Sequence, residues 1–371
     1  MQSLDEKTWM QLSAFGVDAP LCIEATHSSI DGVRLIDDGE KLVPYITRSD
    51  VNNGLARFVS QKNYEFGSDD GGCITVGLDT QTAFYQPHKF VTGQNVQIIT
   101  GKNLSEDIAQ FLVPILRQQM TAKFNWGGNG ATLGRMKKLS IMLPVTDDGT
   151  PDYEYMAEYT RQKREAFLEK YRAYVEKRIA ELGEPVDIPA LNEKDWAPFF
   201  ITSLFSSIVP GKGKGLNHLN KVSDGGINYI GATNRNNGVL CYVEKNDHSR
   251  SMILNGNCIG FIKNGDGSAG FAIYKAEPFI STSDVLYGYS EWLNKFTGLF
   301  FVVAQDMIEH KYSHGYKRNK EHLASDKVML PTNEKGEPDY KYMEQYSKNM
   351  MLKKYKQYLT YIDRKGGQSV E

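Results

Sequence analysis

The feature that most constrains the fold of this 371-residue chain is an internal repeat. Landmarks of the first half return in the same order in the second half, 184 to 190 residues later. The matched pairs are Trp9 with Trp196, Tyr45 with Tyr229, Phe111 with Phe301, Lys123 with Lys311, and Met142 with Met329. A period this long indicates two copies of a whole domain, because solenoid repeats are only about 20 to 50 residues long.

Each copy begins with about 140 residues that read as mixed α and β structure. Short runs of β-branched and aromatic residues, such as 73–76 and 258–262, predict strands. Asn-Gly dipeptides between such runs are typical of hairpin turns; they fall at 53–54, 237–238, 255–256 and 264–265. Segments 105–123 and 290–311 have the pattern of helices that interrupt the strands. The expected fold class is therefore α+β.

A long helix is expected to close each copy. Pro151 and Pro338 stand near the two helix starts, where the missing N–H of proline costs no hydrogen bond. Apolar residues then recur at spacings near three and four. We expect mixed domains at 1–150 and 184–335, and helices at 151–183 and 336–365. The helices either form an antiparallel coiled-coil spacer, which we favour, or each packs only on its own domain.

Composition excludes several classes of protein. No apolar run approaches the roughly 20 residues that span a bilayer, and the N-terminus lacks the pattern of a signal peptide. The four cysteines form no CxxC pair, which argues against a disulfide scaffold and a zinc site. These are Cys22, Cys73, Cys241 and Cys258. We therefore expect a cytoplasmic protein without membrane association.

Four motifs resemble catalytic or ligand-binding signatures but lack the required context. Residues 265–270 satisfy GxGxxG, yet the strand-like run 271–274 follows where a dinucleotide fold needs a helix. The Gly-Lys-Gly-Lys-Gly run at 211–215 lacks P-loop spacing. His310 and His314 are part of no HExxH pattern and have no nearby Cys or Asp to complete a metal site, and the two Pro-Asp-Tyr turns lack the rest of a nuclease motif. We expect no catalytic residue and no metal ligand in this chain.

The net charge of −2 does not indicate a nucleic-acid partner, so a DNA-binding chain of this composition must concentrate basic residues locally. Two aligned segments meet this demand. Residues 123–138 hold four basic residues and no acid, and residues 311–327 hold five basic residues against two acids. One such segment alone would be read as an ordinary surface loop, but two in register favour contacts with DNA phosphates and base edges.

The predicted DNA-contacting residues lie in these segments, near the two Asn-Asn-Gly turns, or in the 211–215 loop. They are Arg48, Lys123, Asn125, Arg135, Lys137, Lys138, Lys212, Lys214, Arg235, Lys311, His314, Lys317, Arg318 and Lys320. Among them Arg135, Lys137, Lys317 and Arg318 are the preferred phosphate or base contacts.

This plan resembles the specificity subunits of type I restriction-modification systems, which carry two non-identical target-recognition domains, each followed by a helical spacer. The turns at 143–153 and 330–340, which contain Leu-Pro and end in Gly-x-Pro-Asp-Tyr, look more like the S-like subunits of BcgI-like type IIB enzymes. The Leu-Pro-Pro-hydrophobic-x-x-Gln ending that is commoner in type I subunits is missing. The resemblance covers essentially the whole chain and leaves the system type open.

The resemblance implies a non-catalytic subunit that reads a bipartite, asymmetric site in double-stranded DNA. Partner methyltransferase and endonuclease subunits would supply the chemistry and hold S-adenosylmethionine and Mg²⁺, whereas this chain would bind no cofactor. An alternative from another class is a nuclease with a dispersed active site that acts on DNA by itself. A DNA-mimic inhibitor is disfavoured, since it would need acidic stripes in place of the basic segments.

Overall fold

The structure is a computed structural model that describes residues 2–124, 129–213, 215–265, 267–313 and 315–367. The chain divides into two compact units, Met1–Tyr171 and Arg172–Glu371, which we call unit 1 and unit 2. The division falls inside one long helix, α3 (Tyr153–Leu182). Both helices and sheets occur in each unit, as the α+β prediction requires.

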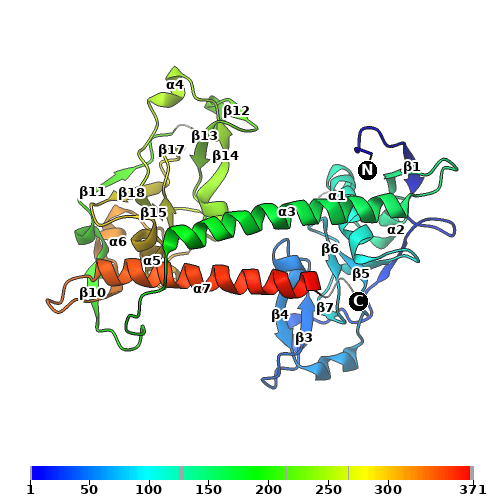
Figure 1. Ribbon diagram of the computed structural model, residues 1–371, viewed down its shortest axis with the longest axis horizontal. Coiled ribbons are helices and arrows are strands. Elements are labelled where there is room, and N and C mark those ends of the chain that lie inside the picture. Colours follow the sequence, from blue (N-terminus) through cyan, green and yellow to red (C-terminus); the bar gives the residue numbers. More distant parts are fainter. Residues whose placement is uncertain (1, 125–128, 214, 266, 314, 368–371) are drawn as a thin grey trace. The chain divides into compact units, whose positions relative to one another are not determined.

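The described residues of unit 1 form three sheets, two α-helices and the first part of α3 (Figure 1). Its strands are β1 (Trp9–Ser13), β2 (Cys22–Ala25), β3 (Val43–Ile46), β4 (Leu55–Val59), β5 (Cys73–Gly77), β6 (Thr82–Gln86), β7 (Val91–Thr92), β8 (Val96–Thr100) and β9 (Ser140–Pro144). Its helices are α1 (Glu106–Lys123) and α2 (Leu133–Met136). The strand orders are β1-β9, β2-β8-β5-β6 and β4-β3-β7.

In the part of unit 2 that the structure describes, this arrangement returns with one further strand and one further short α-helix. Its strands are β10 (Trp196–Phe200), β11 (Ser207–Pro210), β12 (Lys221–Val222), β13 (Ile227–Ile230), β14 (Val239–Val243), β15 (Cys258–Ile262), β16 (Ala272–Lys275), β17 (Phe279–Ser281), β18 (Val285–Tyr289) and β19 (Lys327–Pro331). Its helices are α4 (Asp247–Arg250), α5 (Lys295–Asp306), α6 (Lys320–Ser325) and α7 (Tyr340–Gly367). The strand orders are β10-β19, β11-β18-β15-β16 and β12-β14-β13-β17.

Strand registers confirm the repeat at the level of single residues. In the two-stranded sheets Trp9 pairs with Pro144 and Trp196 pairs with Pro331. In the four-stranded sheets Ile74 and Ile259 hold the same place in β5 and β15. Both of these isoleucines are fully buried. Equal registers mean that the same side of each sheet faces the core in both copies.

In each unit one helix covers the matched four-stranded sheet, which is β2-β8-β5-β6 in unit 1 and β11-β18-β15-β16 in unit 2. Helix α1 packs on β6 and β5, and α5 packs on β16 and β15. The N-cap Ser105 accepts a hydrogen bond from the Ile108 N–H at the start of α1. Asn294 forms a reciprocal capping box with Thr297 at the start of α5. The apolar faces of both helices belong to the largest buried cluster of their unit.

The ring contacts correct one pairing of the repeat. Trp9 stacks on Phe111 with a centroid separation of 6.2 Å, and Trp196 stacks on Phe300 at the same separation. The counterpart of Phe111 is therefore Phe300, and the sequence alignment of Phe111 with Phe301 is wrong by one residue. Phe301 instead replaces Leu112, and both of these side chains are buried. Adjacent aromatic residues at 300 and 301 made the two registers indistinguishable from the sequence.

Each long helix begins on its own unit through the same contacts. The Lys7 ammonium lies 2.7 Å from the Asp152 carboxylate, and Lys194 lies 2.9 Å from Asp339. The first turns bury Met156 in unit 1 and Met343 in unit 2. The N-terminal part of both helices thus packs on its own unit, as the alternative interpretation expects.

Within unit 2 the last part of α3 also runs antiparallel to α7. Arg172 lies 2.5 Å from Asp363, whereas Val186, just beyond the end of α3, donates its N–H to the Asn349 side chain at 3.1 Å. Residue numbers therefore rise along one segment as they fall along the other. The side chain of Val175 is fully buried at this level. The favoured antiparallel pairing is present for this part of α3.

Candidate nucleic-acid interface

The predicted DNA-contacting segments meet the four-stranded sheets at one end, which we call the hairpin end. It is the end where β5 turns into β6 in unit 1 and where β15 turns into β16 in unit 2. The GxGxxG segment 265–270 lies in the second of these turns, between antiparallel strands. This confirms a hairpin, and it excludes the strand-to-helix geometry that a dinucleotide needs.

In unit 2 backbone hydrogen bonds tie several loops together at the hairpin end. Lys263, the first residue after β15, donates its N–H to the carbonyl of Asp284 at 2.9 Å. The Arg318 N–H in turn donates to the Lys263 carbonyl at 3.0 Å, so the basic segment is attached to the hairpin. The Ser268 hydroxyl bonds to Asn234 at 3.0 Å, which brings in the turn that contains Arg235.

Unit 1 repeats the same bonds with other side chains. Leu78 donates its N–H to the Asn95 carbonyl at 3.0 Å, and Ala131 donates to the Leu78 carbonyl at 3.1 Å. Leu78 therefore corresponds to Lys263, and Ala131 corresponds to Arg318. The short helices that follow also match, since Met136 of α2 and Leu323 of α6 are both buried. One backbone frame thus presents different side chains in the two units.

Five of the predicted residues of unit 1 are placed on its surface. Arg48 forms an ion pair with Asp79, a residue of the β5–β6 turn, so an acid that the sequence analysis did not consider offsets its charge. Lys123 ends α1 and is exposed, as are Lys137 and Lys138 after α2. Arg135 is also exposed and donates from Nη1 to the Gly130 carbonyl at 3.0 Å. Asn125 lies outside the described residues.

In unit 2 the exposed predicted residues come from three separate segments. Lys212 follows β11, Arg235 begins the turn before β14, and Lys317 and Lys320 flank Asn319, the N-cap of α6. Lys311 is also exposed, with its ammonium 3.5 Å from the Asp326 carboxylate. Lys214 and His314 lie outside the described residues. The structure therefore does not describe the pair of His310 and His314.

Arg318 does not lie on this surface, which corrects the prediction that it contacts DNA. Its side chain is fully buried and ion-paired with Asp326 at 2.9 Å. The guanidinium also donates to the Gly270 carbonyl at 2.9 Å and to Gln305. It lies over the Phe261 ring, 5.3 Å from the ring centroid. Arg318 therefore anchors the basic segment to the core and has no surface to offer a ligand.

Two residues at the hairpin end escaped the sequence analysis. Lys263 is half-buried at the base of the β15–β16 turn. His27 follows the end of β2 and is 60% exposed in its side chain. An offset of 185 residues would have placed His27 opposite Lys212, but the nearest landmarks in the sequence gave offsets of 187 and 184.

Neither a metal site nor a membrane-spanning helix occurs in the described parts of the chain. No group of three or more His, Cys, Asp or Glu side chains among those residues is placed to hold a metal ion. Within the same ranges no helix has the length and apolar character needed to cross a bilayer.

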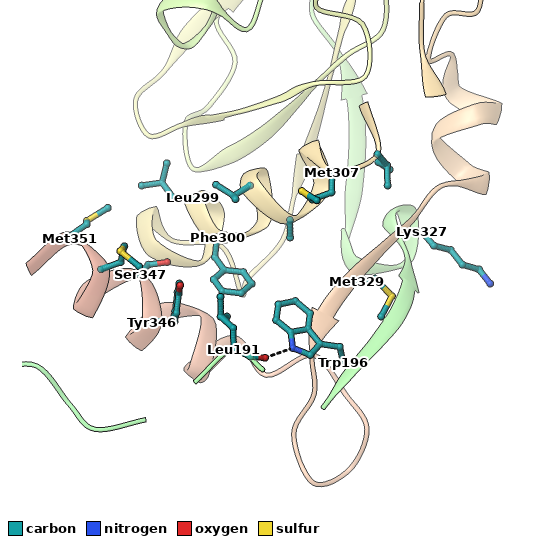
Figure 2. Close-up of a pocket in the computed structure, with 14 residues that line it drawn as sticks. Leu191, Trp196, Leu299, Phe300, Met307, Lys327, Met329, Tyr346, Ser347 and Met351 are labelled. Carbon is teal, nitrogen blue, oxygen red and sulfur yellow. Dashed lines mark hydrogen bonds between the residues drawn. The ribbon is translucent and has the colours of Figure 1, made fainter. Parts of the chain in front are cut away.

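Unit 2 has an apolar groove of about 640 Å³ lined by residues of α5, the first half of α7 and the β10–β19 sheet (Figure 2). Trp196, Phe300 and Met329 line it, and Met307 and Val303 of the α5 region are 75% and 70% exposed at its edge. Exposed apolar patches on a protein surface often mark contacts with other molecules.

The corresponding face of unit 1 is more polar. With Phe111 matched to Phe300, the residues in the places of Val303 and Met307 are Pro114 and Gln118. On the long helix, Met351 is replaced by Arg164, which pairs with Asp107. The two units therefore differ on this face as well as at their hairpin ends.

Comparison with known proteins matches this two-unit arrangement. A family model described as the type I restriction modification DNA specificity domain matches residues 29–170 and again residues 193–360. A curated relative, the type II restriction enzyme BgcI specificity subunit S.BcgI from Heyndrickxia coagulans, is 28% identical over 329 residues. That alignment covers 87% of this chain and 89% of the relative.

Solved structures of similar proteins carry related titles. The crystal structure of a type I restriction-modification S subunit from M. genitalium has a TM-score of 0.47 and 13% identity, and covers 98% of this chain and 95% of that chain. The HsdS subunit from Thermoanaerobacter tengcongensis has a TM-score of 0.30 and 12% identity, with coverage of 96% and 91%.

Two matches of one family model, one in each unit, span more than half of the chain. The chain belongs to the family of DNA specificity subunits of restriction-modification systems. Its function is the recognition of a DNA target, and the alternative of a nuclease that acts by itself finds no support in these comparisons. Members of this family are specificity subunits and are in general non-catalytic.

Proposed function

We propose that each unit reads one half of a bipartite, asymmetric DNA site through its hairpin end. The observation that carries this proposal is the replacement of side chains on a matched backbone. Leu78 and Lys263 occupy one position of the frame, and Gly130 and the exposed Lys317 occupy the position just before Ala131 and Arg318. Because sequence is read by side chains at base edges, one frame with two sets of side chains suits two different half-sites.

Exposed basic residues near both hairpin ends would supply the affinity for the DNA backbone. Lys137 and Lys138 in unit 1 and Lys212 and Lys317 in unit 2 have exposed ammonium-bearing side chains. Each lysine that neutralises a phosphate releases counterions, so binding should weaken steeply as salt rises. We assign these residues to phosphate contacts, and base reading to the loops between them.

The chemistry would reside in partner subunits. We propose that a methyltransferase partner binds S-adenosylmethionine and methylates adenine, and that an endonuclease activity, where the system has one, uses Mg²⁺. The long helices α3 and α7 would fix the spacing between the half-sites and offer surfaces to these partners. The present chain would then direct the complex without taking part in a chemical step.

The proposal is tested by mapping N6-methyladenine across the genome of host cells with the gene intact and with the gene deleted. Loss of one bipartite, asymmetric motif on deletion is the expected result. Re-expression of the gene should restore the motif, which controls for effects of the deletion on neighbouring genes. Loss of a single continuous motif, or of a palindrome, would contradict the assignment of one half-site to each unit.

A further inference from the structure

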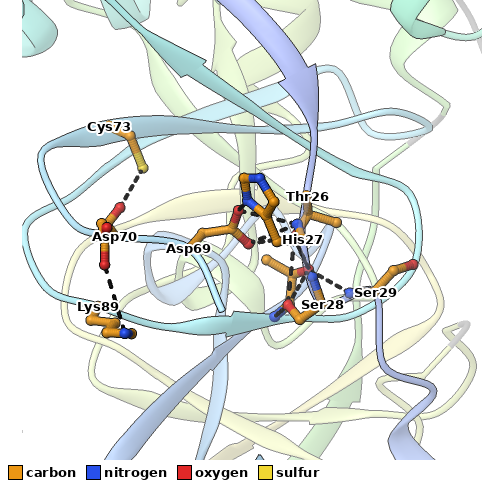
Figure 3. Close-up of polar contacts among 9 residues, drawn as sticks. Thr26, His27, Ser28, Ser29, Asp69, Asp70, Cys73 and Lys89 are labelled. Atoms are coloured by element: carbon orange, nitrogen blue, oxygen red, sulfur yellow. Dashed lines mark hydrogen bonds and ion pairs between the residues drawn. The ribbon is translucent and has the colours of Figure 1, made fainter. Parts of the chain in front are cut away.

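His27 is held at the hairpin end of unit 1 by a buried carboxylate (Figure 3). Its Nδ1 atom lies 2.7 Å from Oδ1 of Asp69, whose side chain is only 2% exposed. Asp69 also accepts from the Thr26 hydroxyl at 2.5 Å and from the backbone N–H of His27 at 3.2 Å. These bonds fix the imidazole ring, while 60% of the side chain remains open to solvent.

The strand registers place His27 opposite a lysine of unit 2. The last pairs of the matched edge strands are Ala25 with Gln97 and Pro210 with Leu286. His27 and Lys212 each lie two residues beyond these pairs. Both therefore leave the four-stranded sheet at the same point.

The partner of His27 is replaced together with it. Asp69 forms an isolated bridge with Phe90, and the matching bridge in unit 2 joins Leu254 to Phe279. Leu254 is buried and cannot accept a hydrogen bond. Unit 1 thus has a histidine paired with a carboxylate, whereas unit 2 has a lysine and carries a buried leucine at the position of that carboxylate. A carboxylate orients an imidazole and favours its protonated form, whereas a lysine ammonium is already charged without such a partner.

We propose that His27, oriented by Asp69, binds a backbone phosphate of DNA in unit 1, in the place that Lys212 takes in unit 2. This inference rests on the proposed function and deepens it. No hydrogen bond joins the Nε2 atom of His27 to any residue that the structure describes. When Nδ1–H donates to Asp69, a neutral imidazole has only a lone pair at Nε2, whereas the protonated ring donates there. Only the protonated form can bond to phosphate.

The surroundings of His27 favour that protonated form. The hydrogen bond to Asp69 and the charge of Asp69 raise the pKa of His27 above its ordinary value, and Glu24 and Asp70 act in the same direction. Lys89 lies 3.8 Å from Asp70 and offsets part of that carboxylate's charge. Because the pKa is raised, the phosphate contact should be complete at low pH and lost as the pH rises through the raised pKa.

The test uses fluorescence anisotropy from pH 6 to pH 8.5. It measures the affinity of the full chain, with its partner subunits, for a duplex that carries the sequence motif found by the genome map. We expect His27→Ala to weaken binding about tenfold at pH 6, since a hydrogen bond to a charged group is lost, and to match the wild type at pH 8.5. The slope of log affinity against log salt at pH 6 should fall by about 1. His27→Lys should keep tight binding and remove the pH dependence.

Two further variants separate a phosphate contact from a structural role. Asp69→Asn should move the loss of affinity to lower pH, because the neutral amide no longer favours the imidazolium. His88→Ala, which removes an exposed histidine of the same unit, is the matched control and should leave the pH profile unchanged. Equal pH profiles and salt slopes for the wild type and His27→Ala would overturn the inference. Absence of binding by the wild-type complex at every pH would instead overturn the proposed function.

Discussion

Arg318 and Lys317 are neighbours in the sequence, yet the structure gives them opposite roles. The guanidinium of Arg318 is buried between the Phe261 and Tyr312 rings and paired with Asp326, whereas Lys317 is exposed. A count of charges in a segment cannot separate the two, because it does not show which cation meets a buried acid. Lys311, Lys317 and Lys320 of the segment are exposed, and their contact with DNA stays a prediction, whereas Arg318 is buried.

Removal of Arg318 should destabilise unit 2. We expect Arg318→Ala to lower the free energy of unfolding by about 3–5 kcal/mol, since the buried Asp326 carboxylate would lose its buried cation and keep only the Tyr312 hydroxyl and the exposed Lys311 ammonium. Chemical denaturation followed by tryptophan fluorescence measures this change. Lys317→Ala is the matched control and should shift stability by less than about 0.5 kcal/mol. A stable Arg318→Ala protein that has lost only DNA affinity would contradict the buried assignment.

The exposed and the buried cysteines should differ sharply in their reactivity toward alkylating reagents. Burial raises the pKa of both the Cys73 and the Cys258 thiol to about 12, whereas Cys22 is exposed. The thiolate is the reactive form, so the two buried thiols should resist alkylation. We expect iodoacetamide at pH 8 to modify Cys22 well before Cys73 or Cys258, as read by peptide mass spectrometry. Comparable labelling of all three in the native protein would show that these cores open readily.

At the scale of elements, the helix covering the sheet was predicted well in one unit and less well in the other. The predicted segment 105–123 agrees with α1, whose N-cap is Ser105. In unit 2 the predicted segment 290–311 is longer than α5, which begins after the Asn294 capping box and ends at Asp306. Trp292 explains the late start, since its indole N–H donates to the Leu204 carbonyl at 2.6 Å. That contact joins positions 88 residues apart and has no local signature.

The antiparallel packing of α3 on α7 in unit 2 depends on apolar burial more than on its surface ion pair. Arg172 and Asp363 are both substantially exposed, and such pairs contribute about 0–1 kcal/mol. Val175, by contrast, is fully buried.

We expect Val175→Asp to release the end of α3 from α7, because it places an unpaired carboxylate in a buried position. Amide hydrogen exchange should then quicken in residues 172–182 and in the facing part of α7, while the sheet β11-β18-β15-β16 stays protected. Lys177→Asp, a change at an exposed position of the same helix, is the matched control. Unchanged exchange in Val175→Asp would mean that the helices do not depend on this contact.

At the scale of the whole molecule, the repeat was evident from the sequence because its landmarks are residues that define the scaffold. Trp9 and Trp196 each donate their indole N–H to a backbone carbonyl at 2.9 Å and stack on a phenylalanine of the covering helix, so both positions tolerate little change. The hairpin ends were harder to predict. The Arg48–Asp79 pair, the burial of Arg318 and the match of His27 with Lys212 all depend on contacts between distant loops. The predicted boundaries of the domains remain predictions.

The division of the target between the units is the central claim, and a chimeric chain tests it most directly. Residues 1–150 are replaced by residues 188–337, the matching segment at an offset of 187, so that both hairpin ends carry the side chains of unit 2. The replacement preserves the first contact of the long helix, since Lys194 then faces Asp152 in place of Lys7. Expression with the partner subunits and mapping of N6-methyladenine give the motif that the complex modifies. We predict that one half-site of the wild-type motif disappears and that the other occurs twice. Methylation of the unchanged asymmetric motif by the chimera would contradict the account.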